Sequence, residues 1–445
     1  MTAAAPQPPL EGRESTALAI VGGGFTGLWA ALYAKELDPA ADVTVLEQTR
    51  CGAGASSRNG GFLQSSLTHG IGNGEARFPD EIDTLERLGL ESFDALAVDL
   101  ERYGIDAEYE LVGDLSVALT DTETAELAEA ADQARAYGHT VDLLDTEAVR
   151  AQVSSPTYLA GLWDRTGAAL VNPAKLVAGL RAAALAAGVV IHEFSPVQTV
   201  ADHAAGLRLT TDAGVLSAER ALIATSAYPS PLRRLGAYIA PVYDYALMTE
   251  PLTAAQLAEI GWRNRQGIGD CANQFHYYRL SADNRILWGG YDAVYRYGGP
   301  VRPDLDAHEP TFATLAQHFF TTFPQLRGIR FTHAWGGAID TCSRFSVFFG
   351  TALRGRVAYA VGYTGLGVGA SRFGGRTALD LLDGRQTEAT ATRFVRSRPL
   401  PFPPEPARSA VIQFTRNRLA AADMRDGKRG VWLRTLDRVG LGFDS

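Results

Sequence analysis

The sequence predicts a fold of mixed α/β and α+β class, with a Rossmann-like domain and a second domain built on an antiparallel sheet. Three observations predict it. A glycine-rich turn near residue 24 lies between an apolar run and a helical pattern, and a second glycine-rich turn follows the apolar run 357–361. The segments 241–250 and 274–291 between them are rich in tyrosine, tryptophan and phenylalanine, which favour antiparallel strands. With 445 residues, the chain is long enough for two or three domains.

The first glycine turn has the spacing of a dinucleotide site. Gly22, Gly24 and Gly27 fit the pattern G-x-G-x-x-G, with Phe25 and Thr26 between the last two glycines. In this pattern the glycines permit a tight turn, close approach of the backbone to a pyrophosphate, and close packing of the helix on the strand. The N-terminus of the following helix then presents N–H groups and a partial positive charge to the phosphates.

An acidic residue lies at the end of the second predicted strand, the position that contacts the ribose in dinucleotide sites. The run 42–47 predicts a second strand that ends in Glu47, twenty residues after Gly27. A carboxylate there accepts hydrogen bonds from ribose hydroxyls and repels a 2′-phosphate, so the pattern favours FAD or NAD over NADP. The alternative is an ordinary turn between a strand and a helix in an α/β protein.

The remaining elements follow from periodicity and from turn residues. Helical spacing predicts helices over 78–103, 121–137, 174–187 and 410–424, and a further helix from the second glycine turn to Leu382. Short apolar or alternating runs predict strands over 110–120, 189–194, 207–211 and 220–225. Residues 51–73, rich in Gly, Ser and Asn, are predicted to form a loop. The second α/β block therefore lies far from the first, and the segment between them is predicted to be an insertion.

The composition is that of an ordinary globular protein and argues against several classes of function. A net charge of -9 disfavours a broad nucleic-acid surface. The three cysteines, Cys51, Cys271 and Cys342, form no metal-binding or disulfide pattern, so we expect no metal and a cytoplasmic location. Residues 1–15 lack the apolar core of a signal peptide and are predicted to be disordered. The glycines within the apolar run 16–34 favour a buried strand and helix over a transmembrane segment.

The second glycine turn, which begins at Gly362, is not followed by an acidic strand end that would make it another nucleotide fold. The N-terminus of its helix could instead face the electron-rich N1–C2=O2 edge of a reduced flavin. No other G-x-G-x-x-G occurs between residues 55 and 360, where enzymes that take electrons from NAD(P)H usually carry one. We therefore expect one FAD spanned by both turns, and electrons supplied by the organic substrate.

The residues from about Leu18 to Asp383 resemble the FAD-dependent D-amino acid oxidase superfamily. The resemblance is strongest to its gamma-glutamylputrescine oxidase-like, glycine oxidase-like and sarcosine oxidase-like members. Besides the two turns and Glu47, it is carried by the loop 54–61 (Gly-Ala-Ser-Ser-Arg-Asn-Gly-Gly), by Asn172-Pro173, and by the segments 225–228 and 277–281.

The resemblance implies a discontinuous FAD-binding domain of the glutathione-reductase type, made of residues 16–90, 155–235 and 330–390. The substrate domain would comprise 91–154 and 236–329, and a linker with a docked helix would occupy 391–445. The backbone near Val197 would contact the adenine. The residues expected to bind FAD are Gly22, Gly24, Phe25, Thr26, Gly27, Glu47, Gln48, Ser56, Arg58, Asn59, Gly60, Gly61, Val197, Thr225, Gly362, Gly365, Leu366 and Gly367.

The family's reaction needs few acid–base groups, because the flavin N5 accepts a hydride from the carbon next to the amine nitrogen and water then hydrolyses the imine. An apolar wall and one or two polar anchors would suffice. We assign Tyr278 and Trp335 to catalysis, with Arg279 as the anchor of a substrate carboxylate; a structural ion pair is the alternative for Arg279. His276 is expected to be structural. The full set of candidate wall residues, each of which could instead belong to the core, is Tyr243, Tyr245, Tyr277, Tyr278, Trp288, Tyr291 and Trp335.

Two features depart from the family pattern. The position at which sarcosine oxidase-like members attach FAD through a cysteine falls near Gly337 and not on Cys342, so we expect noncovalent FAD. Some members activate O2 with a lysine, but Lys35, Lys175 and Lys428 all lie outside the aromatic-rich segment. The sequence thus predicts an amine or amino-acid oxidase that reduces O2 to H2O2. The alternatives are a flavin dehydrogenase for an amine or 2-hydroxy acid with another electron acceptor, and a flavin-binding subunit without turnover.

Overall fold

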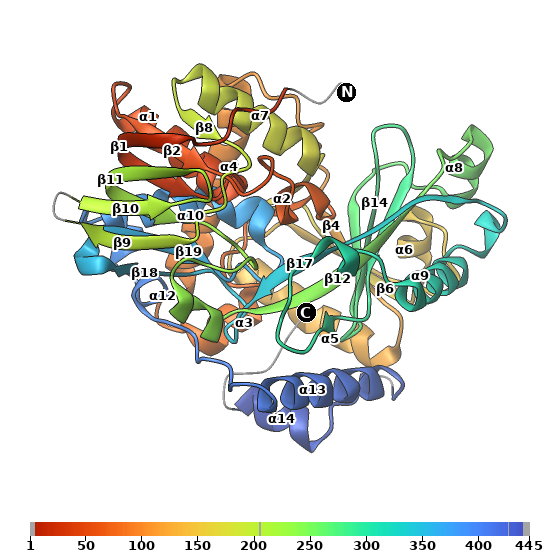
Figure 1. Cartoon of the computed structure of the whole chain (residues 1–445). Helices are drawn as coiled ribbons and strands as arrows, with labels where there is room; N and C mark the ends of the chain where they lie inside the picture. Colours follow the sequence, from red (N-terminus) through yellow and green to blue (C-terminus); the bar gives the residue numbers. More distant parts are fainter. Residues whose placement is uncertain (1–4, 204–205, 426, 439–445) are drawn as a thin grey trace.

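The computed structural model describes residues 5–203, 206–425 and 427–438, and it contains two large sheets with helices packed on them (Figure 1). The eight-stranded sheet has the order β18–β19–β11–β1–β2–β8, with β10 and β9 added beside β11. Its central strands are parallel, which confirms the predicted Rossmann-like domain. The strands are β1 Gly12–Val21, β2 Val43–Leu46, β8 Val190–His192, β9 Thr199–His203, β10 Gly206–Thr210, β11 Gly214–Ile223, β18 Phe348–Ala352 and β19 Val357–Val361.

Alternate residues of β1 face opposite sides of this sheet. Leu18 and Ile20 belong to a core that includes the helices α1 (Phe25–Leu37), α4 (Ile82–Arg102), α7 (Pro173–Ala186) and α10 (Gly367–Leu382). Ala19 and Val21 belong to a second core on the side of the β9–β10 hairpin. Both faces of the parallel strands are therefore buried, as is usual for a parallel sheet.

The nine-stranded sheet has the order β16–β12–β15–β14–β13–β4–β6–β5, and β17 pairs with β12. It is antiparallel except where β13 runs parallel to β4. The helices α8 (Ala254–Ile260) and α9 (Glu309–Thr322) pack with one face of it in a separate core rich in aromatic residues. The strands are β4 Asp114–Ala118, β5 Val141–Leu144, β6 Ala160–Asp164, β12 Ala240–Thr249, β13 Gly267–Asp270, β14 His276–Leu280, β15 Ile286–Gly290, β16 Val294–Tyr295 and β17 Phe331–Thr341.

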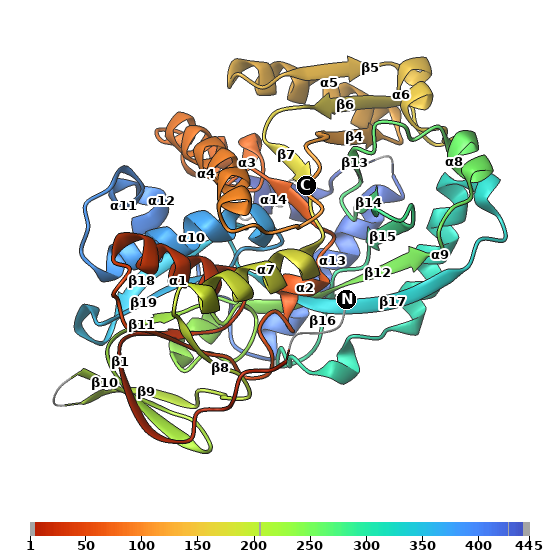
Figure 2. The same ribbon diagram turned by 90° about the horizontal axis from the view of Figure 1, so that it is seen from above.

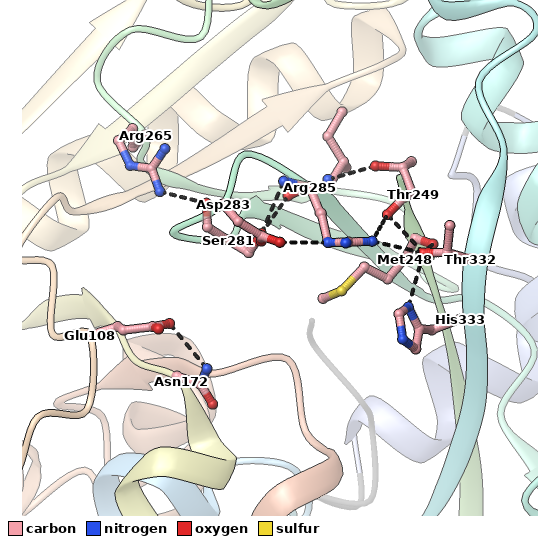
Figure 3. A network of polar contacts seen from close by, with 11 residues as sticks. Glu108, Asn172, Met248, Thr249, Arg265, Ser281, Asp283, Arg285, Thr332 and His333 are labelled. Atoms are coloured by element: carbon pink, nitrogen blue, oxygen red, sulfur yellow. Dashed lines mark hydrogen bonds and ion pairs between the residues drawn. The ribbon is translucent and has the colours of Figure 1, made fainter. Parts of the chain in front are cut away.

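Polar contacts fasten the β14–β15 hairpin to its neighbours (Figure 3). Arg285 donates to the carbonyl of Thr249 in β12 at 3.2 Å and to the hydroxyl of Thr332 in β17 at 2.9 Å. Arg265 pairs with Glu110 and donates to the carbonyl at the end of the hairpin. These contacts fix the aromatic-rich strands relative to the rest of the sheet.

The strand pairing differs from the predicted domain ranges at two places. We placed 155–235 and 330–390 with the FAD-binding domain, but β6 pairs with β4 and β5, and β17 pairs with β12. The prediction of a disordered N-terminus is also wrong for its described part, because Leu10 is buried and β1 begins at Gly12 beside Gly214. Residues 1–4 lie outside the described residues.

The remaining elements connect the sheets or pack beside them (Figure 2). The segment predicted as a loop contains α2 (Ala55–Arg58), α3 (Ile71–Arg77) and β3 (Phe62–Gln64), and β3 pairs with β7 (Ala168–Leu170). Helices α5 (Asp121–Ala136) and α6 (Thr146–Gln152) accompany β4, β5 and β6. After α11 (Glu388–Ala391) and α12 (Arg393–Arg396), the chain ends in α13 (Ala407–Asp423) and α14 (Val431–Arg438), which pack on each other.

Candidate functional site

One cavity of about 800 Å³ is lined by residues of both sheets, of the loop 54–62 and of the C-terminal helices. It brings together residues that are far apart in the sequence. All the residues predicted to bind FAD line it except Gly27 and Gly362, and so does Trp335. Tyr278 and Arg279 are not among the described residues that line it.

The first glycine turn connects β1 to α1, and its geometry requires glycine. Gly22 has a φ of +113°, and a Cβ there would lie 2.3 Å from the carbonyl oxygen of Ala224. A Cβ at Gly27 would lie 1.9 Å from the carbonyl oxygen of Gly22. Gly27 therefore permits the close packing of helix on strand behind the turn, while Gly22 and Gly24 line the cavity.

Glu47 follows β2 and lies beside this turn. Its carboxylate accepts hydrogen bonds from the backbone N–H of Gly23 at 2.8 Å and of Thr49 at 2.9 Å. Burial raises the pKa of Glu47. The carboxylate is thus held at the edge of the cavity, where it could accept hydrogen bonds from a ribose.

The loop after α2 is held by its own side chains. The Asn59 amide oxygen accepts from the N–H of Gly61 at 2.9 Å, and the indole N–H of Trp335 donates to the carbonyl of Arg58 at 2.8 Å. The Arg58 guanidinium forms an ion pair with Asp306. This loop is therefore tied to β17 of the second sheet.

The second glycine turn lies against the first. The Thr26 hydroxyl donates to the hydroxyl of Tyr363 at 2.8 Å, which ties α1 directly to the turn before α10. The buried carboxylate of Asp340, which also lines the cavity, accepts from the N–H of Gly362 at 2.7 Å and fixes the start of the turn. At Gly365, whose φ is +98°, a Cβ would meet no atom within 4 Å, so the backbone of this turn is open toward the cavity.

The chemistry of the lining fits FAD. The N-termini of α1 and α10 and the glycine backbone offer N–H groups, and Glu47 offers an acceptor. The hydroxyls of Thr225 and Ser371 line the cavity and are buried without a hydrogen-bond partner in the described chain. Buried polar groups normally have partners, so these two hydroxyls indicate a polar ligand.

The pleat of the second sheet decides which aromatic residues reach the cavity. Tyr277 pairs with Gly269 and with Gly289, and these residues share the face that looks into the cavity. Its neighbour Tyr278 points to the opposite face, where its hydroxyl lies 2.7 Å from that of Tyr158 in the core. Of the predicted wall, the cavity is lined by Tyr243, Tyr245, Tyr277, Tyr291 and Trp335, and not by Tyr278 or Trp288.

Arg279 lies beneath the loop rather than in the cavity. Its Nε donates to the carbonyl of Gly60 at 2.5 Å, and a Cβ at Gly61 would lie 2.9 Å from its Nη2. Burial lowers the pKa of this guanidinium to about 10. This position differs from the predicted substrate anchor and gives Arg279 a role in supporting the loop.

Four residues that the sequence did not single out also line the cavity: Gln64, His69, Asp114 and Asp244. Burial raises the pKa of Asp114 to about 7 and that of Asp244 to about 6. Burial lowers the pKa of His69, whose φ is +64°. None of the four lies in a recognisable motif, and only the pairing of distant strands brings them together.

The C-terminal segment forms part of the cavity wall. Arg416 of α13 forms an ion pair with Asp292, and Asp423 accepts from the backbone N–H groups of Asn273 and Gln274 at 2.9 and 3.0 Å. Ile412 and Leu433 also line the cavity. The helix predicted to dock, α13, therefore contacts the β13–β14 turn, and together with α14, which was not predicted, it covers the cavity on that side.

The other candidate residues lie away from the cavity. His276 bonds to Asp270 at 2.7 Å and to His318 at 2.9 Å. The Cys342 thiol is buried and donates to backbone carbonyls. Within the described residues, no group of three His, Cys, Asp or Glu side chains is arranged to hold a metal ion. Among the helices of the described chain, none combines the length and apolar character that crossing a bilayer requires.

Comparison with known proteins agrees with this geometry. Residues 17–381 match the family described as FAD dependent oxidoreductase. The chain is 33% identical over 420 residues to gamma-glutamylputrescine oxidoreductase of Escherichia coli (strain K12), with 92% of each chain covered. It is 30% identical over 397 residues to the probable oxidoreductase OrdL of Rhizobium meliloti (strain 1021), with 86% of each chain covered.

Solved structures share the fold at lower identity. Glycine oxidase from Geobacillus kaustophilus matches with a TM-score of 0.72 and 22% identity, over 86% of this chain and 99% of that chain. L-Proline dehydrogenase from P. horikoshii matches with a TM-score of 0.68 and 17% identity, over 86% and 96%. The chain belongs to the family of FAD-dependent oxidoreductases, and FAD is its cofactor.

Proposed function

We propose that this protein oxidises the C–N bond of a small amine or amino acid. The neutral amine loses a hydride from the carbon next to nitrogen and a proton from the nitrogen, and water hydrolyses the resulting imine to an aldehyde or keto acid with release of ammonia or an amine. O2 then takes up the two electrons and becomes H2O2. The observation that carries the proposal is that the aromatic sheet face with Tyr277 and Trp335 lines the same cavity as both glycine turns.

The similar proteins support this reaction class. One is named gamma-glutamylputrescine oxidoreductase, and similar structures are named glycine oxidase and iminodiacetate oxidase, the latter from Chelativorans sp. BNC1 with a TM-score of 0.69. All three names refer to an amine or an amino acid. When bound, FAD supplies the acceptor for the hydride.

The contribution of the chain is to orient the substrate and to exclude water. The Tyr277 hydroxyl donates to Asp244 at 2.5 Å, and its pKa is raised well above 10, so it remains protonated and fixed. The indole of Trp335 is fixed through its bond to the Arg58 carbonyl. The C-terminal helices cover the cavity on the side of the β13–β14 turn, which limits the access of solvent.

A dehydrogenase that passes electrons to another acceptor is the second candidate. It is favoured by the positions of the lysines: none of the three lines the cavity in the described chain, and Lys175 pairs with Asp106 and Glu108 on the surface. The noncovalent binding of FAD is supported by Gly337, which lines the cavity at the position expected for a tether but carries no thiol.

Two measurements test the proposal. Anaerobic mixing of the yellow holoenzyme with a panel of amines and amino acids should bleach the flavin for at least one compound, and a panel that leaves the flavin oxidised would contradict the proposal. In air, one H2O2 per substrate identifies an oxidase. Turnover with an artificial electron acceptor but without H2O2 would identify the dehydrogenase.

A further inference from the structure

An acidic side chain stands on the cavity face of the nine-stranded sheet. Asp114 of β4 pairs with Gly267 of β13, and two residues further along β13 Gly269 pairs with Tyr277 of β14. Because side chains two residues apart share a face, Asp114 and Tyr277 point to the same side of the sheet. Both residues line the cavity, together with Gly269 between them.

The Asp114 carboxyl has no cationic partner in the described chain. Its Oδ2 accepts a hydrogen bond from the Gln64 amide at 2.8 Å, while Oδ1 is buried without a hydrogen-bond partner among the described residues. The charged group that acts on it from β6 is another acid, Asp164, which is itself bonded to His139. A buried carboxyl in this situation lacks compensation for its charge.

Gln64 fixes this carboxyl relative to the second glycine turn. Gln64 ends β3, the strand that follows the Gly60–Gly61 loop, and its own carbonyl oxygen would lie 2.0 Å from a Cβ at Gly369 in the first turn of α10. The backbone of β3 and the N-terminus of α10 are thus in contact. Asp114 is therefore held beside the part of the cavity that is formed by the Gly60–Gly61 loop and the second glycine turn.

The cations that could hold a substrate carboxylate have other partners. Arg279 bonds to Gly60 beneath the loop and does not line the cavity. Arg58 forms an ion pair with Asp306, and Arg416 forms one with Asp292. The two other arginines of the lining also have partners: Arg408 donates to the carbonyls of Pro403 and Gly236, and Arg429 donates to the amide oxygen of Asn273 at 3.1 Å. The face around Tyr277 instead carries two acids, Asp114 and Asp244.

We propose that Asp114 binds the ammonium group of the substrate, and that the substrate is an aliphatic amine whose reacting end carries no carboxylate. The inference deepens the proposed function and rests on it. An ammonium group donates to a carboxylate in a charge-assisted hydrogen bond, which is stronger when solvent is excluded. It would also supply the partner that the buried carboxyl lacks, and this carboxylate would take one N–H proton before the hydride leaves, because the C=N bond forms with the lone pair of the neutral nitrogen.

The test uses three probes that cannot be oxidised, because the carbon that bears their amino or hydroxyl group carries no hydrogen. tert-Butylamine is the cation, tert-butanol is its uncharged isostere, and 2-aminoisobutyrate adds the carboxylate. Calorimetric titration of the oxidised holoenzyme should show tert-butylamine binding at least about tenfold more tightly than either of the others. Equal or tighter binding of 2-aminoisobutyrate, or no binding of tert-butylamine, would overturn the inference.

Variants locate the site. Asp114→Asn keeps the shape and removes the charge, and it should weaken tert-butylamine binding by about 10- to 100-fold. Asp142→Asn is the matched control, since Asp142 is a partly exposed acid of the same sheet that pairs with Arg165 outside the cavity. Unchanged affinity in Asp114→Asn would refute the role of this residue. Failure of the proposed function is distinct, because it would appear as an oxidised flavin in every anaerobic reduction.

The wild-type protein gives a second test that needs no variant to fold. Burial raises the pKa of Asp114 to about 7, Asp164 of β6 also raises it, and Gln64 of β3 and the backbone N–H of Leu115 lower it. Protonation should therefore weaken tert-butylamine binding by about tenfold per pH unit below 7, while the amine itself stays charged. Asp244, on the same face, titrates about one unit lower. An affinity for tert-butylamine that does not change between about pH 5 and about pH 8 would overturn the inference.

Discussion

Replacement of Arg279 by methionine distinguishes a residue that supports the FAD-binding loop from a residue that binds substrate. The Arg279 Nε donates to the buried carbonyl of Gly60 at 2.5 Å. Hydrogen bonds from charged groups contribute about 1.5–3 kcal/mol, and loss of this one leaves the carbonyl without its partner. About 1.4 kcal/mol corresponds to a tenfold change in a dissociation constant. If the lost hydrogen bond destabilises the loop in the FAD-bound state, the dissociation constant of FAD should rise by about 10- to 150-fold.

The free energy of unfolding should change much less than the affinity for FAD. Burial lowers the pKa of Arg279 from 12.5 to about 10, which corresponds to roughly 3 kcal/mol of unfavourable desolvation. Methionine removes this cost and keeps an apolar stem of similar length. In the apoprotein, loss of the hydrogen bond to Gly60 lowers the free energy of unfolding, while removal of the desolvation cost raises it. We therefore expect the urea midpoint of the Arg279→Met apoprotein to stay close to that of the wild type.

The dissociation constant of FAD, measured by fluorescence on titrating the apoprotein, is the assay. Arg265→Met is the matched control, because Arg265 pairs with Glu110 outside the cavity and should not affect FAD. Unchanged FAD affinity in Arg279→Met, together with a KM that rises only for substrates with a carboxylate, would refute the assignment and restore the role of substrate anchor.

Four further outcomes are expected. Tyr278→Phe should lower the free energy of unfolding by about 1–3 kcal/mol and leave flavin reduction unchanged, whereas Tyr277→Phe should slow flavin reduction by at least about tenfold; the reverse pattern would contradict the assigned sheet faces. Hydrogen bonding to Asp164 raises the pKa of His139 to about 9. The stability contributed by protonated His139 should therefore be complete below about pH 6.5, and the free energy of unfolding should fall by about 1–2 kcal/mol as the pH rises through about 9. This fall should be absent in His139→Gln. Deletion of residues 407–445 should leave FAD bound and raise the KM by at least about tenfold, and an unchanged KM would show that these helices do not bound the site. Precipitation with acid should release FAD into the supernatant, and flavin that stays with the protein would show a covalent bond.

The glycine turns could be predicted from the sequence because their geometry is local. Gly22 and Gly27 are five positions apart. The positive φ of Gly22 and the close approach of Gly27 to the carbonyl of Gly22 both arise within the turn, although the contact of Gly22 with Ala224 does not. The strand before the turn, the helix after it and Glu47 at the end of the next strand form one βαβ unit. The predicted Rossmann-like fold follows from such short-range patterns.

The aromatic face that lines the cavity could not be predicted, because it depends on the register between distant strands. Tyr277 and Tyr278 are both aromatic, so alternation alone does not show which one faces the cavity. Pairing with Gly269 and Gly289 decides this in the structure. Arg279 shares the face of Tyr277 but is covered by Gly60 and Gly61, which come from a loop more than two hundred residues earlier.

Acidic residues of the cavity were missed for a related reason. Asp114 has no motif around it, and it gains its environment from Gln64 of β3 and from β13 and β6. The assignment of β6 and β17 to the wrong domain has the same origin, since strands that are pairs in space are separated by long insertions in the sequence. Periodicity identifies strands but does not give their partners.

The central claim is that one FAD spans both glycine turns, and a crystal structure of the holoenzyme tests it most directly. The account predicts the pyrophosphate at the N-terminus of α1, beside Gly22 and Gly24, and the flavin ring between the Gly60–Gly61 loop and the turn at residues 365–367. The hydrogen bond between the hydroxyls of Thr26 and Tyr363 holds the first and second glycine turns next to each other. A flavin ring directed away from the second turn, or away from Tyr277, would contradict the account.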